Sequence, residues 1–474
     1  MDRNIVIGKY TLESLTNGMY SDPLDLYREY IQNAVDSIDS TRQPVPGDEQ
    51  FSIQIQVDKL AGTISIQDNG GGIPANSAVQ TLVDIGNSEK DKKKMRGFRG
   101  IGRLAGLGYS NELIFSTSFQ GECVKTVVSF DTCLLRKLLL SQNENVVSIN
   151  DVMRRIVKIY TETEQEQAHY FIVELNGVSI KEKLLDEEEV ENYLIQHAPL
   201  PFKKEFVWAS TIKEKSRILG VEIPEYCIEL NGRQIFKPYE NTFVCDRVKK
   251  REDSIYDIKV IPFYREGKLS AVLWYGVIGF YGTILNNQIK GLRIRQGNLL
   301  IGDKSTCNML FKEERFNGWM IGELHVVDSD LIVNARRDYF EQNEAHYDLL
   351  ESFEEWSTSQ IREIRKVSCQ RTLSEKKKAI IETEKVDDIN KFANGEADYI
   401  DREESEEVSE IDFMDKLSWI LNQKQGKTKY MALNINNRLT NEQKKILEQV
   451  FDIVKAQYRK KEAEEFINTI VDNI

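Results

Sequence analysis

Three polar side chains share one face of a helix predicted near the start of the chain. Glu29, Asn33 and Asp36 are separated by four and three residues in the segment 27–38, and residues at these spacings are neighbours on a helix surface. A carboxylate, a carboxamide and a second carboxylate fit a general base, a metal ligand and a contact made through water. The other interpretation at this point is a solvated helix face.

Two glycine-rich segments follow, each at a place where the backbone could approach a ligand closely. The first covers residues 68–74 and comes directly after a predicted strand. It begins with Asp68, which could accept a hydrogen bond from an amino group such as the exocyclic amine of adenine. The second covers residues 97–108 and opens an apolar segment, where free N–H groups and a helix dipole suit a phosphate. Taken singly, each segment is also compatible with a tight turn or with glycines that serve packing.

The elements that must position these residues are helices first and strands next. Asp22 followed by a proline supplies the cap and first turn of the helix that carries Glu29. Apolar and polar residues alternate over 51–57 and over 62–67, which indicates two antiparallel strands with one buried face. A charged run over 86–96 predicts a loop between the two glycine segments. The cations in and beside this loop either contact phosphates or form a solvated surface: Lys90, Lys92, Lys93, Lys94, Arg96 and Arg99.

The bulk composition is that of a chain that can bury cores in about three domains. The chain has 474 residues, 41% of them hydrophobic and 29% charged, with a formal net charge of -13. This charge does not favour nucleic acid as the partner, although a local basic patch stays possible. The six cysteines have no metal-binding spacing, and the longest apolar run, residues 271–282, is too short to cross a bilayer. We expect a cytoplasmic protein with reduced thiols and no membrane association.

The three site elements, taken together and in this order, resemble the nucleotide-binding site of the GHKL superfamily. This family unites gyrase, the ninety-kilodalton heat-shock chaperones, the histidine kinases and the MutL mismatch-repair proteins. The resemblance implies a Bergerat-type α/β sandwich ATPase domain over 1–180 and an α+β middle domain over 181–345. It does not extend to 346–474, where the residue pattern itself predicts a mostly helical C-terminal region. The whole chain is therefore expected to be α+β. ATP and Mg²⁺ are the ligands that the resemblance implies.

The resemblance also assigns a role to each site residue. Glu29 would be the general base that activates water, Asn33 the magnesium ligand, Asp36 a contact through water, and Asp68 the acceptor for the adenine amine. Residues 86–96 would form a lid over the nucleotide. The glycines and their neighbours would let base, sugar and phosphates pack against backbone: Gly70, Gly72, Ile73, Gly97, Gly100, Ile101 and Gly102.

A later segment is similar to the catalytic loop of the chaperones' middle domain. Asn334 is followed three residues later by Arg337 and then by an acid, and by that match Arg337 would reach the γ-phosphate from the second domain. Arg336 is the alternative if the register slips by one, and a surface-exposed helix start is the other interpretation. One departure concerns the Gly-Thr pair that the family has before a late strand. Here Ala168 and His169 precede the strand predicted over 170–175.

Three classes of function remain open from the sequence. The first is a chaperone-like ATPase that acts on a protein client, and the second is a DNA-engaged clamp of the MutL or MORC type. The third is a nucleotide-binding regulator with little hydrolysis, for example in a bacterial defence system. An acidic linker is predicted over 390–410, and a last amphipathic helix is predicted from Thr440. Such an apolar stripe packs on its own domain, or it serves a homodimer or a protein partner. The resemblance implies the homodimer, since the family dimerises near the C-terminus.

Overall fold

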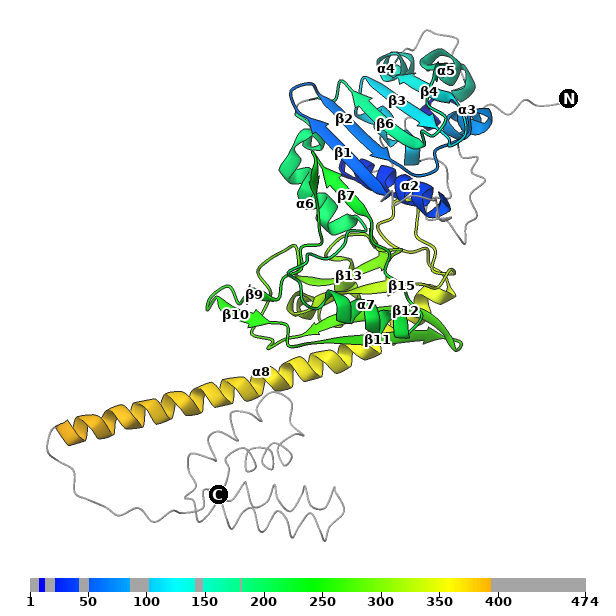
Figure 1. The fold of residues 1–474 in the computed structure, drawn as a ribbon. Coiled ribbons are helices and arrows are strands. Elements are labelled where there is room, and N and C mark those ends of the chain that lie inside the picture. Colours follow the sequence, from blue (N-terminus) through cyan, green and yellow to red (C-terminus); the bar gives the residue numbers. More distant parts are fainter. Residues whose placement is uncertain are drawn as a thin grey trace. The chain divides into compact units, whose positions relative to one another are not determined.

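The computed structural model describes residues 8–12, 22–41, 51–85, 102–140, 148–179 and 181–393 (Figure 1). The chain divides into two compact units, Met1–Lys378 and Ala379–Ile474, and the first unit contains both sheets and the candidate site. The fold is α+β, as the sequence predicts. Most of the predicted acidic linker and the helix predicted from Thr440 lie outside the described residues.

An eight-stranded sheet forms the N-terminal part of the first unit, in the order β5-β4-β3-β6-β2-β1-β7-β8. Alternate residues of β1 and β2 are buried, so the predicted strand pair is present with one face covered. Neighbouring strands are antiparallel except for β1 and β7, which are parallel. The strands are β1 Ser52–Asp58, β2 Thr63–Asp68, β3 Glu112–Ser118, β4 Val124–Asp131, β5 Val157–Thr163, β6 Tyr170–Asn176, β7 Cys227–Leu230 and β8 Arg233–Gln234.

Helix α2 (Asp25–Thr41) carries the predicted catalytic face and packs against β2. Its start is fixed as expected, because the backbone N–H of Leu24 donates to the side chain of Asp22. Apolar residues of α2, among them Tyr27 and Ile31, are buried in the core beneath the sheet. The other helices and 3-10 turns of this part are α3 Ala75–Val83, η1 Gly102–Gly108, α4 Thr132–Leu140, α5 Ile149–Ile156, η2 Lys183–Leu185 and α6 Glu187–His197.

A second sheet, in the order β11-β12-β15-β13-β14, forms the middle part and has its own apolar core. Helix α8 runs without a break from Glu344 to Ala393. No helix among the described residues is both long and apolar enough to cross a membrane. The elements are α7 Ala209–Ile218, β9 Thr242–Cys245, β10 Arg251–Ser254, β11 Asp257–Arg265, β12 Lys268–Val277, β13 Gly291–Gln296, β14 Leu299–Ile301, η3 Thr306–Leu310, η4 Glu314–Trp319, β15 Ile321–Val326 and α8 Glu344–Ala393.

Strands β7 and β8 join the N-terminal sheet, although the chain before and after them belongs to the middle part. Helix α7 packs against β11 and β12 of the middle sheet. The chain then enters the N-terminal sheet, where β7 pairs with β1, and it returns to the middle part at β9. Strand β7 is therefore part of the N-terminal sheet, although its residues lie within the middle domain predicted over 181–345. The proposed domain boundary near residue 180 stays a prediction, and one strand pair crosses it.

A buried cluster of charged side chains surrounds Glu323 of β15, the central strand of the middle sheet. Its carboxylate accepts from Lys237 at 2.6 Å and from the Tyr239 hydroxyl at 3.0 Å, and it is also paired with Arg295. Lys237 and Glu323 are fully buried. Burial raises the pKa of Glu323, but the charges of Arg295 and Lys237 outweigh it and hold this pKa well below the usual value.

Breaking this cluster should destabilise the protein strongly. We expect Lys237→Met to lower the free energy of unfolding by about 3 kcal/mol, because it leaves a buried carboxylate short of one partner. Arg233→Met is the matched control, since it removes an exposed ion pair with Glu191 and should change stability by less than about 1 kcal/mol. Chemical denaturation of both variants measures the difference, and equal losses would contradict the expectation.

Candidate functional site

Glu29 lies where α2, the second glycine segment and a loop of the middle part meet. One carboxylate oxygen is 3.0 Å from Nε of Arg337. A Cβ atom placed on Gly102 would lie 2.1 Å from the other oxygen, so only glycine lets the backbone of η1 come this close to the carboxylate. The structure thus brings together three residues that the sequence separates by 73 and 235 positions.

Helix α2 holds η1 through a buried tyrosine. The hydroxyl of Tyr30 donates to the carbonyl of Arg103 at 3.0 Å and accepts from the backbone N–H of Gly106 at 2.9 Å. Tyr30 is the residue after Glu29, and burial raises its pKa above the usual value, so the hydroxyl stays a donor. This contact sets the distance between the Glu29 carboxylate and the start of η1.

Asp68 ends β2 as a buried carboxylate with ordered partners. Its Oδ1 accepts from the Ser37 hydroxyl and from the backbone N–H of Gly70, both at 2.9 Å. It is 2% exposed, and burial, which these hydrogen bonds only partly offset, raises its pKa to about 7. A buried acceptor at a strand end, beside a glycine turn, suits an amino group of a planar ligand.

The first glycine segment is folded tightly against neighbouring strands. Gly72 has φ +67°, and a Cβ there would meet the carbonyl of Ser118 at 1.9 Å. The N–H of Ile73 donates to the Thr117 hydroxyl at 2.9 Å, which in turn donates to the Tyr170 carbonyl at 3.0 Å. These contacts fix the turn after Asp68 between β3 and β6.

His169 stands at the place of the family's late Gly-Thr pair. Its Nδ1 is 2.9 Å from the carbonyl oxygen of Gly70, because β6 pairs with β2 and brings residue 169 beside the glycine turn. His169 was not among the site residues predicted from the sequence, because the strand pairing that brings it there is not visible in the local pattern. Ser37 was also missed, although it follows Asn33 by four residues and so lies on the predicted polar face.

Asn33 and Asp36 lie on the same side of α2 as Glu29. Asp36 is buried, and Asn33 is half-buried. The side chain of Asn33 bonds to none of the described residues, so its carboxamide oxygen fits a role as the one protein ligand of a Mg²⁺ ion otherwise held by phosphates and water. Among the described residues there is no group of three histidine, cysteine or acidic side chains that could hold a metal. Gly97, Gly100, Ile101 and the predicted lid lie outside the part that the structure describes.

Arg336 and Arg337 have different partners in the loop after β15. The side chain of Arg337 forms an ion pair with Glu29. The backbone carbonyl of Arg336 accepts a hydrogen bond from Nη2 of Arg28 at 3.1 Å. Arg336 is exposed and Arg337 half-buried. Of the two registers that the sequence left open, the geometry favours Arg337 as the residue that reaches the site.

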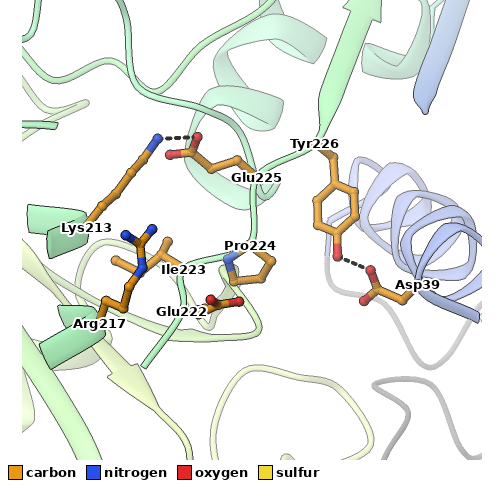
Figure 2. Close-up of a pocket in the computed structure, with 8 residues that line it drawn as sticks. All are labelled: Asp39, Lys213, Arg217, Glu222, Ile223, Pro224, Glu225 and Tyr226. Atoms are coloured by element: carbon orange, nitrogen blue, oxygen red, sulfur yellow. Dashed lines mark hydrogen bonds and ion pairs between the residues drawn. The ribbon is translucent and has the colours of Figure 1, made fainter. Parts of the chain in front are cut away.

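A polar cavity of about 560 Å³ lies at the other end of α2 (Figure 2). In it, Lys213 pairs with Glu225 at 2.6 Å and the Tyr226 hydroxyl donates to Asp39 at 2.5 Å. Asp39 follows Glu29 by ten residues, which corresponds to about 15 Å along a helix axis. This cavity is therefore separate from the contact between Glu29 and Arg337.

In the N-terminal part, helices cover one face of a mixed sheet. Residues 27–156 match the family model described as histidine kinase-, DNA gyrase B-, and HSP90-like ATPase. The N-terminal part of this chain is therefore a domain of that ATPase family. The matched residues include α2, both strands of the first pair and η1.

Several chaperone proteins named HtpG are similar to parts of the chain. The protein from Buchnera aphidicola subsp. Schizaphis graminum is 27% identical over 179 residues, covering 34% of this chain and 28% of that protein. The protein from Rhodospirillum rubrum is 36% identical over 84 residues, covering 16% and 13%. The protein from Bordetella parapertussis is 36% identical over 87 residues, covering 17% and 14%. The aligned stretches thus span less than a third of these curated relatives.

Proposed function

We propose that this protein is an ATP-hydrolysing conformational switch of the heat-shock-chaperone-like class. The observation that carries the proposal is the contact between Glu29 of the family domain and Arg337 of the middle part at 3.0 Å. A carboxylate base and a cation from a second segment meet at a glycine-lined helix start, which is the arrangement that phosphoryl transfer to water requires.

Each candidate site residue that the structure describes has a role in this mechanism. Asp68 accepts a hydrogen bond from the adenine amine, and the turn at Gly72 lets the base pack against backbone. Asn33 would ligate Mg²⁺, which supplies charge neutralisation between the phosphates when bound. Glu29 orients and deprotonates the attacking water. The glycines from Gly97 onward and the lid complete the site in the proposal.

Arg337 couples hydrolysis to the arrangement of the two parts. Without nucleotide its guanidinium neutralises Glu29. A γ-phosphate carries more negative charge than one carboxylate, so it would draw Arg337 away and leave Glu29 free to bind the water. ATP thereby moves the loop after β15, and hydrolysis returns it. This movement is how we propose that ATP acts on a protein client.

The name of the relatives supports a protein client, since they are called chaperone proteins. A homodimer and a cytoplasmic location stay predictions from the sequence. So does the alternative of a regulator that binds nucleotide with little hydrolysis.

A second candidate, an ATPase that engages nucleic acid, is favoured by one basic cluster. Lys290, Lys304 and Arg247 come from three separate segments of the middle part. Burial, and then the charges of Lys304 and Arg247, lower the pKa of Lys290. None of the three forms an ion pair with any described carboxylate. A polyanion would relieve this repulsion.

The test is to measure ATP binding and phosphate release by the full chain, with and without Mg²⁺. We expect micromolar ATP binding and slow turnover that stops when Mg²⁺ is chelated. Turnover that rises with duplex DNA would favour the second candidate. Binding without any turnover, with and without DNA, would favour the regulator and overturn the enzyme.

A further inference from the structure

Helix α6 contacts both the family domain and the middle sheet. Tyr193 faces α2, and its hydroxyl donates to Oδ1 of Asp25 at 2.8 Å. One turn later, Gln196 accepts from Nε of Arg293 at 2.8 Å and donates to the carbonyl of Gln288 at 2.9 Å. A short helix is thus fixed to both parts by hydrogen bonds.

Asp25 also contacts Arg28. The same Oδ1 that accepts from Tyr193 is 3.2 Å from Nη1 of Arg28. Tyr193, Asp25 and Arg28 are all buried, and burial raises the pKa of Tyr193 well above the usual value, so its hydroxyl remains a donor. Hydrogen bonds to a buried charge are stronger than those between neutral groups.

Arg28 then reaches the loop that carries Arg337. Its Nη2 donates to the carbonyl of Arg336 at 3.1 Å, and the backbone N–H of Gly302 donates to the next carbonyl, that of Arg337, at 2.8 Å. Two consecutive carbonyls are therefore held by two different parts of the molecule. Between them, Arg337 has φ +57°, a left-handed conformation that is unfavourable for a residue other than glycine.

We propose that Tyr193 and Asp25 are positioning residues that, through Arg28, set where Arg337 stands relative to Glu29. The inference rests on the proposed function for its effect on hydrolysis, whereas its effect on the loop does not depend on ATP. A purely structural role would be to hold α6 against α2 without any influence on the loop.

Tyr193→Phe is the first variant, because it removes only the hydroxyl and keeps the ring, which stacks on His197 at 3.8 Å. Tyr226→Phe is the matched control. It also removes a tyrosine hydroxyl that donates to an aspartate of α2, Asp39, but at the opposite end of the helix (Figure 2). Asp25→Asn is the second test variant, since it keeps an acceptor for Tyr193 and removes the charge that holds Arg28.

The first measurement is hydrogen–deuterium exchange in the nucleotide-free full chain. We expect exchange of the Gly302 and Arg337 amides to become about tenfold faster in Tyr193→Phe and Asp25→Asn, because the loop opens more often. Tyr226→Phe should exchange at the wild-type rate. Unchanged exchange in Tyr193→Phe, or an equal increase in the control, would overturn the proposal. If Asp25→Asn alone exchanges at the wild-type rate, Tyr193 and Asp25 only hold α6 against α2 and do not position the loop.

The second measurement is ATP hydrolysis by the same proteins. We expect kcat to fall about tenfold in the two test variants with KM unchanged, since the nucleotide contacts are intact and the position of Arg337 is lost. If no protein, wild type included, hydrolyses ATP while the exchange responds as expected, the proposed function fails and the positioning of the loop stands. A rise in KM with kcat unchanged would count against positioning.

Discussion

Glu29→Gln should bind ATP as the wild type does and hydrolyse it at least about 100-fold more slowly. Glutamine keeps the size and the hydrogen-bonding oxygen of the side chain, so the close approach of Gly102 is retained. It cannot take a proton from water, and general base catalysis is lost. Phosphate release under saturating ATP, together with a binding titration, measures both effects.

The control for Glu29→Gln is the same exchange at Glu188, an exposed residue in the first turn of α6. This variant should hydrolyse ATP at the wild-type rate. Residual activity of Glu29→Gln within a factor of three of the wild type would mean that another group activates the water.

The two neighbouring arginines give a companion comparison at the same site. Arg337→Ala should bind ATP normally and lose at least about tenfold in kcat, because the cation that stabilises charge on the transferred phosphoryl group is gone. Arg336→Ala removes an exposed side chain and keeps the carbonyl that Arg28 contacts, so it should behave as the wild type. The reverse result would move the catalytic role to Arg336.

Asp68→Asn should lose nucleotide binding, by about 100-fold or more. Both the Ser37 hydroxyl and the Gly70 N–H donate to one oxygen of Asp68, so an asparagine must place its oxygen there. Its NH₂ group then stands where the second carboxylate oxygen would accept the adenine amine, and two donors face each other. A titration with ATP in excess Mg²⁺ measures the loss. Near-normal affinity would show that Asp68 does not read the base.

The same substitution should change how stability depends on pH. The pKa of Asp68 is about 7 when folded and near 3.8 when unfolded, so the folded protein binds more protons between these values. This contribution to stability is complete below pH 4 and is lost as pH rises through 7. Asparagine does not titrate, so Asp68→Asn removes this pH dependence. We expect the free energy of unfolding of the variant to rise relative to that of the wild type between pH 5 and pH 8. Urea denaturation at pH 5 and at pH 8 measures this difference. A variant that becomes less stable relative to the wild type at pH 8 would contradict the expected sign.

Much of the fold follows from local patterns in the sequence. The alternation over 51–57 and 62–67 predicted two antiparallel strands, which are β1 and β2. The strand over 170–175 was also predicted, but its place between β2 and β3 was not. Sheet order depends on contacts between segments far apart in the chain. For the same reason the sequence did not show that β7, inside the predicted middle domain, pairs with β1.

The candidate site was predictable where helical spacing and glycine conformation decide the geometry. Glu29, Asn33 and Asp36 follow from the period of α2, and the need for glycine at Gly102 follows from the close backbone approach. His169 could not be found in this way, because it reaches Gly70 through strand pairing. Arg28 could not either, since its partner is a backbone carbonyl 308 residues later. The catalytic and binding roles themselves stay predictions until the variants are measured.

The parallel pairing of β1 with β7 has a consequence for protein synthesis. Ser52 pairs with Cys227, so roughly 175 residues separate the two strands, and at about 5–20 residues per second the ribosome needs roughly 10–35 s to make them. During that time the outer edge of β1 lacks its native neighbour and is open to pairing with other chains. The N-terminal sheet therefore cannot be completed cotranslationally before residue 234, and a fragment ending near residue 180 would keep that edge exposed permanently.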